Sequence, residues 1–188
     1  MNVATRITVF RIVLVPFFLA CLLYYRPERD GLRFAALALF VVGVVSDAVD
    51  GFIARTQGQR SRLGTVLDPL ADKLMLMAAF VALSMLEQLP PSLRVAPWVT
   101  LTVISRDVLI ILGSVLIYYL TGGLEVRPSA LGKATTALQM AAILTVLLRW
   151  PSATWWAAAA ALLTIGSGIS YLRYGTRLLN GSAEQPSV

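Results

Sequence analysis

Four aspartates, Asp47, Asp50, Asp68 and Asp72, are flanked on both sides by long apolar stretches of a 188-residue chain. A charged side chain at bilayer depth costs roughly 2.5–3.5 kcal/mol on insertion scales, and four carboxylates also repel one another. Such a cluster needs positive charge to hold it, and divalent cations prefer carboxylate oxygens as ligands. Two ions a few ångströms apart would form a clamp for displacement at phosphorus. The segment is therefore the predicted active site.

The spacing of the aspartates places them in two pairs, each on one face of a helix. Asp47 and Asp50 are three residues apart, and Asp68 and Asp72 are four apart. The short polar loop 55–62 would bring the two faces together in antiparallel helices. The chain has no histidine, which excludes histidine general bases and most zinc sites. The chemistry must come from carboxylates, Arg, Lys, hydroxyls and metals.

The composition indicates that these helices lie in a lipid bilayer. Apolar residues make up 57% of the chain and charged residues 14%, against about 45–50% and about 25% in soluble domains. Six apolar stretches, each near the ~20 residues that cross hydrocarbon, predict an all-α integral membrane protein with six transmembrane helices and a short N-terminal cytoplasmic segment. The predicted spans are 7–25, 34–54, 65–86, 95–120, 134–148 and 155–172. Residues 1–179 are predicted to form a single domain, followed by a disordered tail at 180–188.

The distribution of Lys and Arg predicts how the chain is oriented. Six spans place the N-terminus, the loops 55–62 and 121–133 and the tail on one side, which carries nine Lys and Arg against five on the other. The positive-inside rule makes this side cytoplasmic, so the predicted site faces the cytoplasm from a multi-pass protein of the cell (inner) membrane. The net charge of +6 fits the same rule and anionic lipid headgroups, and no nucleic-acid partner is predicted.

Small and basic residues accompany the aspartates at fixed positions. The string reads Asp-x-x-Asp-Gly-x-x-Ala-Arg, eight residues, Gly, three residues, Asp, three residues, Asp. Taken alone, Gly51 and Ala54 would also suit close helix packing, and Arg55 would also suit snorkelling to the headgroups. Taken together, the string matches the signature of the CDP-alcohol phosphatidyltransferases in every position. The chain resembles this family over most of its length.

The resemblance implies transfer of a phosphatidyl group from CDP-diacylglycerol to an alcohol, with release of CMP. It implies that the four aspartates bind two ions, Mg²⁺ or Mn²⁺, and that Asp72 is also the general base for the acceptor hydroxyl. A homodimer is expected because homodimers are common in the family. The positions assigned to CDP-diacylglycerol are Gly51, Ala54, Arg55, Ser61 and Gly64, with Asn2, Thr5 and Thr8 near the same pocket.

The acceptor is predicted from basic residues outside this string. An arginine within a span either has a function or pairs with a carboxylate, and Arg106 lies beside Asp107 in the middle of the fourth span. Arg127 and Lys133 add positive charge on the predicted cytoplasmic side. Together the three basic residues predict a glycerol-based anionic acceptor rather than a neutral one, with Asp107 beside Arg106 in the same acceptor site.

Two acceptors and one other class of protein stay open. The sequence from Asn2 to Arg11 resembles bacterial phosphatidylglycerophosphate synthases, which favours glycerol-3-phosphate. The sequences 105–107 and 133–139 resemble instead the eukaryotic-type cardiolipin synthases, whose acceptor is phosphatidylglycerol. A cation transporter would also explain intramembrane carboxylates, but it would not explain the Gly, Ala and Arg at fixed spacing.

Overall fold

Six α-helices make up most of the residues that the computed structural model describes, which are 3–28, 30–57, 62–121 and 130–183. At 3–6, 47, 48, 50–57, 62–72, 114–121, 174 and 177–183 the structure describes the backbone alone. The predicted all-α fold with six long helices is confirmed. In chain order the elements are α1 (Val3–Leu23), α2 (Asp30–Gln57), α3 (Arg62–Met85), the 3₁₀ turn η1 (Pro91–Leu93), α4 (Pro97–Thr121), α5 (Ala130–Leu147) and α6 (Ala153–Ala183).

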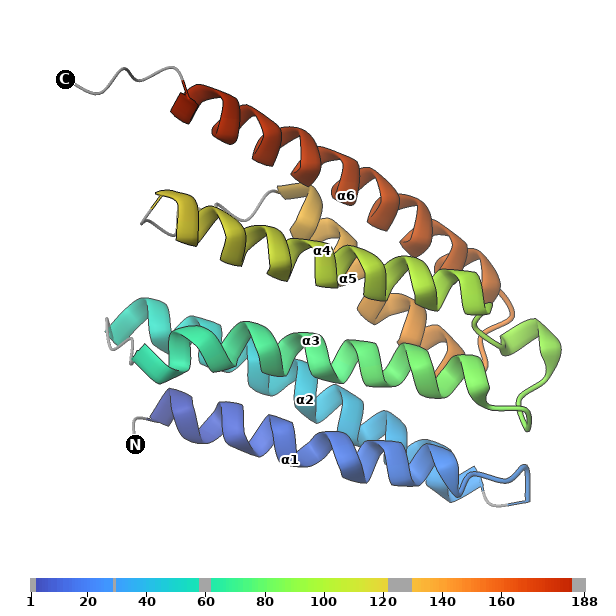
Figure 1. Cartoon of the computed structure of the whole chain (residues 1–188). Coiled ribbons are helices and arrows are strands. Elements are labelled where there is room, and N and C mark those ends of the chain that lie inside the picture. The colour runs from blue at the N-terminus through green and yellow to red at the C-terminus, as the bar shows by residue number, and fades with distance from the viewer. Residues whose placement is uncertain (1–2, 29, 58–61, 122–129, 184–188) are drawn as a thin grey trace.

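Successive helices run in opposite directions, as Figure 1 shows. The start of α1 and the ends of α2, α4 and α6 therefore gather at one end of the bundle, on the left of the view. We call this the motif end, because residues 47–57 of α2 and 62–72 of α3 lie there. Helix α1 packs against both α2 and α3, α6 packs against α4 and α5, and α3 meets α4 between the two groups.

The surface of the bundle is apolar, as expected where helices face lipid. Among the described residues, three stretches are long and apolar enough to cross a membrane, and two shorter apolar helices cover 7–23 and 73–85. Large apolar side chains are exposed on the outside, including Phe17, Leu101 and Trp155. A water-soluble monomer rarely exposes so much contiguous apolar surface. The fold is that of a multi-pass membrane protein.

The core lies where α1, α2, α3 and α5 meet. Phe18 and Phe40 are fully buried, with ring centroids 5.9 Å apart and ring planes tilted by 39°. Phe80 of α3 and Ile143 of α5 are also fully buried in the same cluster. Because lipid is as apolar as these side chains, close packing rather than burial from water holds the helices together. This packing fixes α3, which carries the second pair of aspartates.

A charged clamp ties three helices at the end of the bundle opposite the motif end. Arg33 pairs with Asp30 at 2.9 Å and donates a hydrogen bond to the carbonyl of Leu147 at 2.5 Å. Arg149 pairs with Asp30 at 2.9 Å and donates to the hydroxyl of Tyr25. The hydrogen bond from Arg33 lowers the pKa of Asp30 below its usual value, which keeps the carboxylate charged. Arg149 has a φ of 54°, in the left-handed region that favours glycine at a helix end.

The helices extend beyond the predicted spans. Helix α6 continues to Ala183, so residues 180–183 are helical where the sequence predicts a disordered tail. Its first strong helix breaker is Pro186, which lies outside the described residues together with the rest of 184–188. Hydropathy locates the part of a helix that lies in lipid, whereas breakers and caps decide where the helix ends.

We expect the substitution Gly113→Ala to weaken the packing of α4 on α6. A Cβ at Gly113 would lie 2.9 Å from Cε1 of Tyr171, whose hydroxyl donates to the carbonyl of Ile110 at 3.2 Å. Overpacking of this kind costs about 1–3 kcal/mol, which exceeds the roughly 1 kcal/mol gained by replacing a helical glycine. The midpoint of thermal unfolding in detergent micelles should therefore fall.

The matched control is Gly166→Ala, because a Cβ at Gly166 meets nothing within 4 Å. This variant should be at least as stable as the wild type. Equal stability of the two alanine variants would contradict the close contact between Gly113 and Tyr171.

Candidate active site

A close contact between Gly43 of α2 and Met75 of α3 sets the register of the two aspartate-bearing helices. A Cβ at Gly43 would lie 3.3 Å from Cε of Met75, so the helices approach closely there. The two helices run antiparallel, and both continue from this contact to the motif end (Figure 1). On each helix, residues that are three or four and seven positions away from the contact lie on the same face as the contact. The count towards the motif end runs forward from Gly43 on α2 and backward from Met75 on α3. Those positions are Asp47 and Asp50 on α2, and Asp72 and Asp68 on α3.

This register gives the four aspartates facing positions on neighbouring helices. Their carboxylates lie outside the described side chains, so the predicted metal site stays a prediction. Among the side chains that are described, no group of three or more acidic or Cys residues could hold a metal ion. The donors at the four facing positions are all carboxylate oxygens, which fit Mg²⁺ or Mn²⁺.

The residues predicted to bind CDP-diacylglycerol are only partly described. Thr8 is fully buried on α1. The backbone alone is described at Thr5, Gly51, Ala54, Arg55 and Gly64, whereas Asn2 and Ser61 lie outside the described residues. The helical backbone places 51, 54 and 55 in the last two turns of α2, directly after Asp50.

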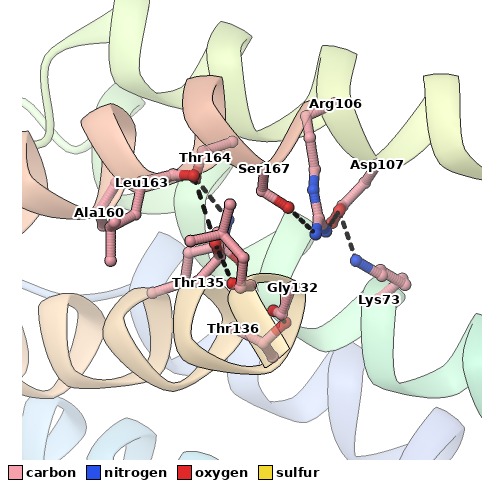
Figure 2. Close-up of polar contacts among 12 residues, drawn as sticks. Lys73, Arg106, Asp107, Gly132, Thr135, Thr136, Ala160, Leu163, Thr164 and Ser167 are labelled. Atoms are coloured by element: carbon pink, nitrogen blue, oxygen red, sulfur yellow. Dashed lines mark hydrogen bonds and ion pairs between the residues drawn. The ribbon is translucent and has the colours of Figure 1, made fainter. Parts of the chain in front are cut away.

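Three charged side chains form a largely buried triad that begins at the residue after Asp72: Lys73, Arg106 and Asp107. Lys73 of α3 donates to Oδ1 of Asp107 on α4, and Nη1 of Arg106 donates to the same oxygen at 2.7 Å. Nη2 of Arg106 donates to Oγ of Ser167 on α6 at 2.8 Å. Figure 2 shows these groups converging between three helices. The triad therefore joins α3, α4 and α6 next to the motif.

The triad carries more positive than negative charge. Asp107 is fully buried and the Arg106 side chain is 7% exposed, whereas Lys73 is 19% exposed. Two cations on one carboxylate leave one net positive charge in the interior of a membrane protein, where charge is expensive. Within the described part of the chain, Nε of Arg106 and Oδ2 of Asp107 are buried without a hydrogen-bond partner. An additional anion would find both charge and donors here.

A second group of polar side chains joins α5 to α6 beside the triad (Figure 2). Nε2 of Gln139 donates to Oγ1 of Thr164 at 2.9 Å. Oγ1 of Thr135 lies 2.8 Å from the carbonyl of Leu131 in its own helix and 3.3 Å from the carbonyl of Leu163 on α6. All three side chains are fully buried. The interior at this depth is polar on α3, α4, α5 and α6, in contrast to the aromatic core around Phe80.

The structure brings together only some of the residues predicted to bind the acceptor. Arg106 and Asp107 are in direct contact, which agrees with the prediction that an arginine within a span can pair with a carboxylate. Lys133 is exposed in the first turns of α5, and Arg127 lies outside the described residues. Lys73 was not predicted to have a role, although a lysine within a span, directly after Asp72, is the signal that could have identified it.

Known proteins resemble most of this chain. A family model described as CDP-alcohol phosphatidyltransferase matches residues 1–166. A Mycobacterium tuberculosis H37Rv protein named "Probable phosphatidylglycerophosphate synthase" is 34% identical over 192 residues, which cover 99% of this chain and 87% of the relative. An Escherichia coli K12 protein named "CDP-diacylglycerol--glycerol-3-phosphate 3-phosphatidyltransferase" is 35% identical over 181 residues, or 91% of this chain and 93% of the relative. With the complete motif placed on two helices in facing register, the chain belongs to the CDP-alcohol phosphatidyltransferase family.

Proposed function

We propose that this protein transfers the phosphatidyl group of CDP-diacylglycerol to glycerol-3-phosphate, releasing CMP and forming phosphatidylglycerophosphate. The observation that carries the proposal is the complete motif of eight fixed positions, whose aspartates occupy facing positions of α2 and α3 in the register set by Gly43 and Met75. The names of the two relatives support glycerol-3-phosphate as the acceptor. Family membership decides against a cation transporter.

The four aspartates would hold two divalent ions, Mg²⁺ or Mn²⁺, between α2 and α3. When bound, these ions supply positive charge that neutralises the diphosphate and stabilises the departing CMP. Asp72 would in addition accept the proton of the acceptor hydroxyl as that oxygen forms its bond to phosphorus. A carboxylate suits this role because no histidine is present.

The CDP-diacylglycerol site would continue along the same two helices. Arg55 would bind a phosphate of the diphosphate, while Gly51 and Ala54 would let the nucleotide approach the backbone closely. Ser61, Gly64, Asn2, Thr5 and Thr8 would complete this site. The acyl chains would lie in the bilayer, with the active site facing the cytoplasm across the inner membrane and the protein assembling as a homodimer.

The acceptor would bind next to Asp72 on the side of the triad. Arg106 supplies a buried guanidinium there, held by Asp107 and Ser167. Arg127 and Lys133 would add positive potential at the cytoplasmic entrance, which raises the local concentration of an anionic acceptor.

A comparison of acceptors tests the proposal directly. Purified protein in mixed micelles with CDP-diacylglycerol and Mg²⁺ or Mn²⁺ should release CMP when glycerol-3-phosphate is added, and the lipid product should be phosphatidylglycerophosphate. Phosphatidylglycerol in its place should give no cardiolipin. Product formation with phosphatidylglycerol alone would assign the protein to cardiolipin synthesis, as the sequence at 105–107 and 133–139 allows. A chelator should stop CMP release, and added Mn²⁺ should restore it.

A further inference from the structure

Lys73 and Arg106 come from different helices, yet both donate to the same carboxylate oxygen of Asp107. Two cations that bind one oxygen atom lie close enough to repel each other. Inside a membrane protein the low dielectric makes this repulsion larger than in water. It is therefore unusual for two long basic side chains to share one oxygen as their hydrogen-bond acceptor and counter-charge. The shared oxygen holds their charged ends side by side and leaves the pair with an excess positive charge.

We propose that Lys73 and Arg106 together form the seat for the phosphate of the acceptor, with Asp107 as the positioning residue that holds them. This inference rests on the proposed function and extends it. Lys73 becomes a specificity-determining residue of the reaction, and Asp107 acts through the two cations rather than by touching the acceptor.

The remaining donors of the two side chains support this seat. A lysine ammonium has three N–H donors and a guanidinium has five. The hydrogen bonds within the described part of the chain use one donor of Lys73 and two of Arg106, and they leave Nε of Arg106 buried without a partner. A phosphate oxygen accepts several such charge-assisted hydrogen bonds at once.

The position of Lys73 in the chain supports the same assignment. A three-carbon acceptor carries its reacting hydroxyl and its phosphate at opposite ends of a short molecule. The group that binds the phosphate must therefore lie within a few bond lengths of the base. Lys73 follows Asp72 directly on α3, so the two residues lie at almost the same depth in the bundle, about 1.5 Å apart along the helix axis. Of the three triad side chains, Lys73 is also the most exposed, at 19%.

A glycine on α6 helps to position Arg106. A Cβ at Gly168 would lie 3.6 Å from Cγ of Arg106, so the aliphatic part of the side chain passes close to the α6 backbone. Together with the hydrogen bond to Ser167 at 2.8 Å, this contact holds the Arg106 side chain against α6. The seat is thus built from α3, α4 and α6.

Substitutions at Lys73 test the seat through the two Michaelis constants. Lys73→Gln should raise the KM for glycerol-3-phosphate on the order of tenfold or more, the usual result of losing a charge-assisted hydrogen bond, and leave the KM for CDP-diacylglycerol at the wild-type value. Lys73→Arg should recover much of the affinity. Glycerol-3-phosphate should also raise the thermal unfolding midpoint of the wild type more than that of Lys73→Gln, a readout that needs no turnover.

The substitution Asp107→Asn tests whether Asp107 holds the two cations in place or only repels the phosphate of the acceptor. If Asp107 only repelled the acceptor, removing its charge would lower the KM for glycerol-3-phosphate. If it holds the two cations, the KM should rise. The matched control is Arg33→Gln, which breaks a partly exposed ion pair in the clamp at the opposite end of the bundle and should leave both Michaelis constants unchanged.

The outcomes separate this inference from the proposed function. If the wild type forms no product with glycerol-3-phosphate, the proposed function fails. If the wild type forms it, and Lys73→Gln leaves the KM for the acceptor unchanged or raises both Michaelis constants equally, the seat is wrong. A lower KM in Asp107→Asn would overturn the positioning role.

Discussion

Asp72→Asn should abolish phosphatidyl transfer while the protein stays folded. Asparagine keeps the shape of the side chain and one oxygen, but it has no charge and cannot take the proton of the acceptor hydroxyl. Loss of a general base alone lowers kcat by roughly 10²–10⁴, and weaker metal binding would add to the loss. CMP release from CDP-diacylglycerol with glycerol-3-phosphate and Mn²⁺ measures the effect directly.

Asp30→Asn is the matched control, since Asp30 is a paired carboxylate at the start of α2, at the opposite end from the motif. It should lose some stability and keep its kcat. Among the other motif aspartates, Asp68→Asn should mainly raise the Mn²⁺ concentration needed for half-maximal activity, because a ligand and not the base is removed. Equal CMP release by Asp72→Asn and the wild type would exclude Asp72 as the base.

The helices and the aspartate pairs could be predicted from sequence because both depend on local periodicity. Apolar stretches of membrane length identify six helices, and spacings of three and four residues put each aspartate pair on one face. The sequence predicts that the loop 55–62 brings the two faces together, but it does not give the register between the two helices. That register depends on the contact between Gly43 and Met75, and either residue alone is an ordinary apolar position in the sequence.

The triad could not be predicted because its members are distant in sequence. Lys73 and Asp107 are 34 residues apart, and nothing local shows which face of α4 meets α3. The sequence does place Arg106 and Asp107 side by side, and it correctly identifies them as unusual for a span. It leaves open whether they pair with each other or with a motif aspartate. The structure gives the first answer among the described residues and adds Lys73 and Ser167.

The triad should respond asymmetrically to the loss of its charges, and this is the second large effect that we expect. Asp107→Leu would leave two cations, the buried Arg106 and the partly buried Lys73, without their shared anion. Breaking a buried ion pair from one side costs about 3–5 kcal/mol. Lys73→Met would instead leave Arg106 and Asp107 as a neutral pair, with the hydrogen bond to Ser167 intact. Unfolding by a denaturing detergent in mixed micelles should show a large loss of unfolding free energy for Asp107→Leu and little or none for Lys73→Met.

This asymmetry separates a structural role of Lys73 from a functional one. If Lys73 served only to join α3 to α4, its removal would destabilise the bundle about as much as removal of Asp107. If Lys73→Met keeps the stability of the wild type and loses affinity for glycerol-3-phosphate, the excess positive charge of the triad serves to bind the acceptor and contributes nothing to the stability of the bundle. Equal destabilisation by the two variants would make Lys73 a structural tie. The extra buried charge would then have to be balanced by the motif aspartates next to it.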